Sequence, residues 1–177
     1  VLQDNSLSCN SSSCFTLELV SPIIYDLNKN LMELAYILQF FNKYNVHTNS
    51  TCSYHLHISK QRTPFSIQHL KNIASFSILL ENGLDKLNPE RINNKYCQSN
   101  RNNISFHNKN LENCIRKINS CNSKLELVNL LNPIDKNAFM VLKRGKGDQY
   151  ALYYRCQRFY KLNLTNLLNE KKTIEIR

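Results

Sequence analysis

Two histidines two residues apart, His55 and His57, have the spacing in this sequence that best suits chemistry. Polar and apolar residues alternate from Ser53 to Ser59, which is typical of a half-buried strand. Alternate side chains of a strand point to opposite faces, so both histidines and both serines share one face. Two imidazoles on one face can reach a single bound group, such as a metal ion or a phosphate. The alternative interpretation is a strand whose histidines are only solvated.

Two other segments alternate in the same way and carry charged residues. Glu18 lies in residues 15–20 and points away from their apolar side chains. Glu175 and Arg177 lie in residues 173–177, opposite two isoleucines. On the assumption that the three strands join one sheet, we expect its open face to display these side chains beside the histidines. Carboxylates and imidazoles bind divalent ions, and an arginine suits phosphate or carboxylate.

Five segments together resemble a known enzyme family. They are residues 17–22 (Leu-Glu-Leu-Val-Ser-Pro), 49–59, 96–101 (Tyr-Cys-Gln-Ser-Asn-Arg), 160–164 and 173–177. In this order they resemble the amidoligases of fungi and bacteria, a branch of the glutamine synthetase-like carboxylate–amine ligases. The resemblance covers the chain from about residue 15 onward. It implies an α+β fold of the glutamine synthetase-like type, with an antiparallel sheet backed by helices.

The chemistry that this resemblance implies is ATP-dependent amide formation. A substrate carboxylate would take the terminal phosphate of ATP, and an amine would then displace phosphate from the acyl phosphate. The substrates would be amino acid-like or peptide carboxylates and amines, and the cofactors ATP and Mg²⁺, with Mn²⁺ as an alternative. By similarity, Glu18, His55 and Glu175 would bind metal, and His57 and Ser59 would lie near the nucleotide. Arg177, with Arg158 as a second candidate, would hold the phosphoryl group or the substrate carboxylate.

Several other functions stay open at this stage. Nothing before Phe15 supplies the paired-glutamate strand of relatives, the chain ends at Arg177, and it begins at Val1 rather than Met. We therefore expect a fold that is incomplete at both ends, and a catalytically degenerate binding module is the main alternative. A zinc protein using Cys52 and the two histidines is a third hypothesis, and a basic nucleic-acid binder a fourth.

Composition narrows these classes only slightly. The net charge is +10, but Lys and Arg are spread along the chain without an aromatic ladder, so we do not expect nucleic acid as the partner. No apolar run approaches the ~18 residues of a membrane span, and no signal-peptide pattern opens the chain. The seven cysteines include no Cys-x-x-Cys, which argues against a disulfide framework or zinc ribbon. We expect a cytoplasmic protein whose oligomeric state the sequence does not indicate.

The remaining patterns predict the order of elements around the site. A loose lead-in of residues 1–14 precedes a single domain of residues 15–177. Helical spacing predicts helices over 27–43, from a Thr63 cap to about Glu81, and over 108–121. Residues 89–107 read as an irregular loop, either a lid or a solvated connection. A hairpin is predicted over 139–154.

Overall fold

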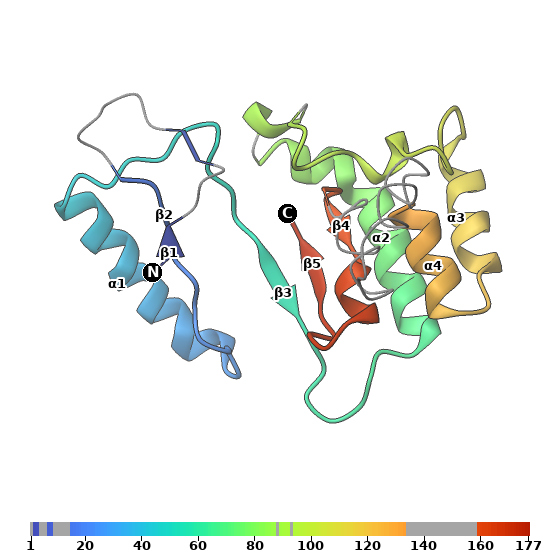
Figure 1. Cartoon of the computed structure of the whole chain (residues 1–177), viewed down its shortest axis with the longest axis horizontal. Coiled ribbons are helices and arrows are strands. Elements are labelled where there is room, and N and C mark those ends of the chain that lie inside the picture. Colours follow the sequence, from blue (N-terminus) through green and yellow to red (C-terminus); the bar gives the residue numbers. More distant parts are fainter. Residues whose placement is uncertain (1, 4–6, 9–14, 88, 93, 134–158) are drawn as a thin grey trace, which may run out of the picture. The chain divides into compact units, whose positions relative to one another are not determined.

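The computed structural model describes residues 2–3, 7–8, 15–87, 89–92, 94–133 and 159–177. The chain divides into two compact units, Val1–Ser53 and Tyr54–Arg177, and each is described by itself. The described residues form four α-helices and small antiparallel sheets, a mixed α+β architecture (Figure 1). The predicted combination of antiparallel strands and helices is therefore confirmed. The predicted hairpin of residues 139–154, like Arg158, lies outside the described residues.

The first unit contains one strand pair and one helix. Strand β1 (Leu2–Gln3) pairs antiparallel with β2 (Leu17–Glu18), with Leu2 opposite Glu18. Helix α1 (Leu27–Lys43) follows, and its bounds match the predicted helix. The side chain of Asp26 accepts a hydrogen bond from the backbone N–H of Asn28 at 3.0 Å. This bond satisfies one of the backbone donors that every helix start leaves without an intrahelical partner.

The second unit is built on a three-stranded antiparallel sheet. Its strands are β3 (Leu56–Ile58), β5 (Ile174–Ile176) and β4 (Leu162–Asn163), in that order across the sheet. The expectation that the Glu18 strand belongs to this sheet is wrong among the described residues. The physical reason is pairing, since the ladder of β2 is formed with β1, whereas β3, β5 and β4 pair with one another.

Three helices form one side of the second unit. They are α2 (Ile67–Asp85), α3 (Leu111–Ser120) and α4 (Lys124–Leu131). Helix α2 begins later than predicted because Ser66, rather than Thr63, accepts the hydrogen bond from the N–H of His69. It also continues four residues past Glu81. None of the helices in the described ranges is long and apolar enough to cross a membrane.

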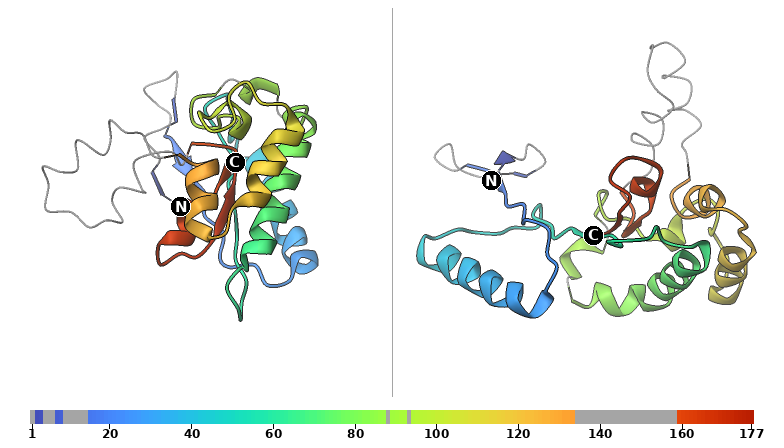
Figure 2. Two further views of the ribbon diagram at one scale, coloured as in Figure 1. Left: turned by 90° about the vertical axis from the view of Figure 1, so that its right-hand side faces the viewer. Right: turned by 90° about the horizontal axis from the view of Figure 1, so that it is seen from below.

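The hydrophobic core lies between these helices and one face of the sheet. Helices α3 and α4 lie beside α2 (Figures 1 and 2). The fully buried members of the core include Leu70, Ala74, Ile78, Cys114, Ile118, Leu127, Leu131, Leu162 and Ile174. Cys114 is thus a small buried hydrophobe, as predicted, and so is Cys121. Because side chains alternate along a strand, the core position of Ile174 turns Glu175 toward the opposite face.

Residues 94–106 form a packed connection rather than a solvated loop. Cys97, Asn100, Asn103 and Phe106 within it are all buried. The backbone of Gln98 makes a parallel bridge to Tyr160, through hydrogen bonds to Phe159 and Lys161 of 2.7 and 2.9 Å. Two short 3-10 helices, η1 (Pro89–Arg91) and η2 (Asn100–Asn102), shape this part of the chain. The interpretation as a solvated loop is therefore wrong for these residues, whereas the lid stays a prediction.

Buried asparagine side chains complete the outer edge of β4. Asn100 donates to the carbonyl of Leu162 at 2.9 Å and accepts from its N–H at 2.8 Å, as a neighbouring strand would. Asn132 donates to the same carbonyl at 3.0 Å and accepts from the N–H of Leu164 at 2.9 Å. Buried backbone groups need such partners. Side-chain amides from two other segments therefore hold β4 in place. They also hold Asn163, which lies opposite Glu175 of β5.

Candidate functional site

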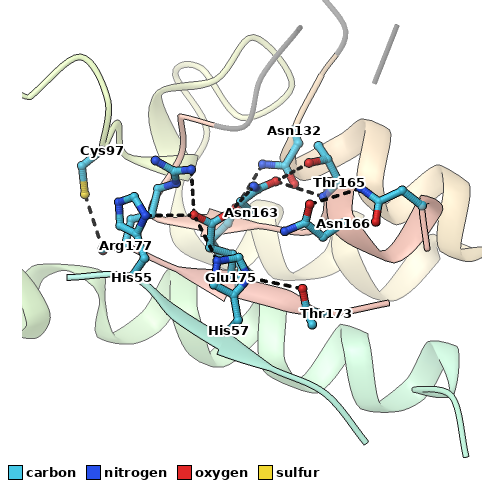
Figure 3. Close-up of polar contacts among 12 residues, drawn as sticks. His55, His57, Cys97, Asn132, Asn163, Thr165, Asn166, Thr173, Glu175 and Arg177 are labelled. Carbon is cyan, nitrogen blue, oxygen red and sulfur yellow. Dashed lines mark hydrogen bonds and ion pairs between the residues drawn. The ribbon is translucent and has the colours of Figure 1, made fainter. Parts of the chain in front are cut away.

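Glu175 is the centre of a polar cluster on the face of the sheet opposite the helical core (Figure 3). Its Oε1 lies 2.7 Å from Nη2 of Arg177, 3.5 Å from Nδ1 of His55 and 3.9 Å from Nε2 of His57. Its Oε2 accepts a hydrogen bond of 2.7 Å from Nδ2 of Asn163. One buried carboxylate therefore organises side chains from all three strands.

The strand register explains why these residues meet. His57 lies directly opposite Glu175 across β3 and β5, and Asn163 lies opposite Glu175 across β4 and β5. Side chains two residues apart on a strand share a face, so Arg177 accompanies Glu175 and His55 accompanies His57. The Cβ atoms of opposed residues are ~5 Å apart, a separation that carboxylate, amide and imidazole groups can span.

Four of the seven predicted site residues are therefore brought together: His55, His57, Glu175 and Arg177. Ser59 follows the end of β3 and is exposed. Glu18 belongs to the first unit, where it lies in β2. Arg158 is outside the described residues. The roles assigned to all seven stay predictions.

The cluster holds its histidines in different surroundings. Burial lowers the pKa of His55 below its ordinary value, and the positive charge of Arg177 lowers it further, whereas Glu175 opposes both effects. His57 is more exposed, and its Nδ1 lies 3.3 Å from Oγ1 of Thr173. The lowered pKa of His55 favours its neutral imidazole. A neutral imidazole can accept a proton or bind a metal ion.

Comparison with known proteins assigns the chain to a family. A family model described as "Putative amidoligase enzyme" matches residues 1–177. The chain belongs to this amidoligase family. The match spans both units and confirms the resemblance inferred from the five sequence segments. No curated protein and no solved structure matches the chain.

Sequence reasoning missed one cation near the candidate site, Arg91. It lies in η1, its exposure is only 8%, and its guanidinium hydrogen-bonds the thiol of Cys97. Cys97 also donates to the backbone carbonyl of Arg177, with a sulfur–oxygen distance of 3.5 Å. The charge of Arg91 contributes to the lowered pKa of His55. No spacing pattern marks Arg91, because it lies in an irregular polar stretch whose packing only the folded chain reveals.

The side chains that could bind a metal ion determine which kind of metal site this amidoligase could form. Within the described ranges, no group of three or more His, Cys, Asp or Glu side chains could hold a metal by itself. That finding gives the zinc hypothesis no support. Mg²⁺, however, usually takes only one or two carboxylates together with substrate phosphates and water. Glu175, with His55 beside it, fits such a shared site as a contributor.

Proposed function

We propose that this amidoligase is an ATP-dependent carboxylate–amine ligase, which joins an amino acid-like or peptide carboxylate to an amine. A glutamine synthetase-like arrangement of the complete catalytic sheet is part of the proposal. Family membership supports ligase chemistry in general. The observation that carries the rest is the Glu175 cluster, in which one carboxylate, two imidazoles and a buried guanidinium converge on one sheet face.

The reaction would proceed in two displacement steps. A carboxylate oxygen of the substrate attacks the terminal phosphorus of ATP, ADP leaves, and an acyl phosphate forms. The amine nitrogen then attacks the acyl carbon, phosphate leaves, and the nitrogen loses a proton. Both steps place negative charge on oxygen atoms of the reacting groups, and positioned cations stabilise this charge. Arg177 would hold the phosphoryl group or the substrate carboxylate, with Arg158 as a second cation.

The nucleotide and its metal complete the proposal. His57 and Ser59 would lie near the nucleotide, and His55 and Glu175 would contribute ligands for Mg²⁺ or Mn²⁺. The metal would supply neutralisation of the phosphate charge. Glu175 is the best supported of these ligands, because Asn163 and Arg177 fix the positions of its two oxygens.

One observation favours a second function, a binding module without ligase activity. Both carboxylate oxygens of Glu175 already have partners, Arg177 at 2.7 Å and Asn163 at 2.7 Å. A carboxylate held in this way can serve to stabilise the sheet alone. The two functions differ in a simple respect, because only the ligase requires a nucleotide response.

A thermal-shift titration with ATP and Mg²⁺ tests the proposal. A ligand that binds only the folded state adds about 2.7 kcal/mol to the free energy of unfolding at 100 times its Kd. We expect such a shift for the native chain, its loss on chelation by EDTA, and its loss in Glu175→Gln. The control is Glu112→Gln, which changes an exposed glutamate of α3. A native chain that shows no shift at saturating nucleotide, with either Mg²⁺ or Mn²⁺, contradicts the ligase and supports the binding module.

A further inference from the structure

Asn163 makes the most buried side-chain contact of the Glu175 cluster. It lies opposite Glu175 in the register of β4 and β5, and its exposure is 1%. Its Nδ2 donates to Oε2 of Glu175 at 2.7 Å (Figure 3). A hydrogen bond from an amide to a buried carboxylate is charge-assisted, and such bonds are stronger than neutral ones.

The orientation of the Asn163 amide is fixed by its other end. The backbone N–H and the hydroxyl of Thr165 both donate to Oδ1 of Asn163, at 3.0 and 2.7 Å. The oxygen of an amide only accepts, whereas its nitrogen only donates. A flipped amide would place its NH₂ group against the backbone N–H of Thr165, and two donors cannot bond each other. Thr165 therefore requires that Asn163 present its NH₂ group to Glu175.

This arrangement divides the two oxygens of Glu175 between two tasks. Oε2 accepts from Asn163 inside the fold, and Oε1 lies toward Arg177 and the two imidazoles. Because Asn163 is neutral, it orients the carboxylate without cancelling its charge. A lysine or arginine at this position would orient Glu175 equally well but would neutralise it. The negative charge of Glu175 is thus directed, through Oε1, toward Arg177 and the two imidazoles.

We propose that Asn163, oriented by Thr165, is a positioning residue of this amidoligase site. It fixes the rotamer of Glu175, so that Oε1 is the oxygen presented to the nucleotide complex and to Arg177. This inference rests on the proposed function. It adds a buried side chain that acts through Glu175 and does not itself touch the ligand.

A matched pair of alanine variants tests the role of Asn163. Asn163→Ala removes the contact to Glu175, whereas Asn132→Ala removes a buried asparagine that is hydrogen-bonded to backbone groups of Leu162 and Leu164. We expect both variants to lower the Tm, but only Asn163→Ala to weaken binding of ATP with Mg²⁺, by tenfold or more in a thermal-shift titration. Equal weakening in both variants, or none in either, overturns the proposal.

A second measurement keeps the test independent of the proposed function. The side-chain ¹H–¹⁵N resonances of Arg177 report its pairing with Glu175. We expect them to shift in Asn163→Ala and to stay unchanged in Asn132→Ala. If the native chain does not bind nucleotide, the proposed function fails while these resonances still decide the positioning role. Unchanged Arg177 resonances in Asn163→Ala overturn that role. Should this variant not fold, Asn163→Leu, which keeps the approximate volume of the side chain and removes the amide that donates to Glu175, replaces it with the same expected outcomes.

Discussion

Nη2 of Arg177 donates to Oε1 of Glu175 across 2.7 Å, and the two side chains are only 7% and 5% exposed. Both charges have been removed from water, which costs several kcal/mol per ion before their attraction is counted. A buried ion pair is often no more stabilising than apolar residues of the same volume. The presence of this pair is therefore weak evidence for a net gain in stability.

Removing one partner of this ion pair should destabilise the fold more than removing both partners. Arg177→Met leaves the charge of Glu175 buried without its guanidinium, and we expect it to lower the free energy of unfolding by about 3–5 kcal/mol. Arg177→Met combined with Glu175→Gln should recover part of that loss. Urea denaturation of the single and double variants measures the effect. Arg116→Met, at an exposed i,i+4 pair, should cost only about 0.5 kcal/mol. A double variant as unstable as Arg177→Met contradicts this account.

The asparagine edge of β4 should contribute strongly to stability. Asn100→Ala leaves the buried N–H of Leu162 without its acceptor and removes donors from the carbonyls of Leu131 and Leu162. Each buried backbone group left unsatisfied costs about 1–3 kcal/mol, so we expect a loss of at least that size. Asn102 belongs to the same 3-10 helix but is exposed, and Asn102→Ala should change stability by less than about 0.5 kcal/mol. Similar losses in the two variants, measured by chemical denaturation, contradict the structural role of Asn100.

The stability of the fold should fall on the acid side because of His55. Burial and the charge of Arg177 lower its pKa, so the unfolded chain binds a proton at a higher pH than the folded chain does. Below an unfolded pKa of about 6.5, protonation therefore favours unfolding, and this loss continues until the pH passes the folded pKa. His55→Gln should lose less stability than the native chain between about pH 7 and pH 5. NMR titration of the His55 ring provides the direct check, and a midpoint above its ordinary value contradicts the prediction.

Three buried thiols should resist alkylation. Burial raises the pKa of Cys97, Cys114 and Cys121, and the thiolate is the reactive form. We expect iodoacetamide at pH 8 to modify these three cysteines more slowly than Cys52, which is half-buried. Peptide mapping by mass spectrometry measures each rate, and all four should react at similar rates in concentrated urea. Fast alkylation of Cys114 in the folded protein contradicts its place in the core.

Alternation and spacing identified the central part of the site. A period of two residues placed His55 with His57 and Glu175 with Arg177, and the structure brings all four residues together. Helical spacing likewise gave the bounds of α1. These predictions succeeded because they depend on local geometry, in which the backbone alone determines which side chains share a face.

The contacts that support the site could not be predicted in this way. Asn163 belongs to an Asn-Leu-Thr triplet that resembles a glycosylation motif, yet it is buried against Glu175. Arg91 and Asn100 lie in an Asn-rich stretch whose composition indicates a solvated loop, and both are buried. Their partners are far away in sequence, so only the tertiary fold reveals them. Pairing between strands is non-local for the same reason, which explains why the expected place of Glu18 in the sheet was wrong.

The asparagine edge also limits how the three-stranded sheet can grow. Asn100 and Asn132 occupy the outward-facing backbone groups of Leu162 and Leu164, so an incoming strand would find no row of free donors and acceptors along β4. The other outer strand of this sheet is β3, which contains His57 and begins directly after His55. Extension is thus directed to the histidine strand. Any segment that widens the sheet, from this chain or from another molecule, would lie next to the imidazoles and could bring new side chains to the same cluster.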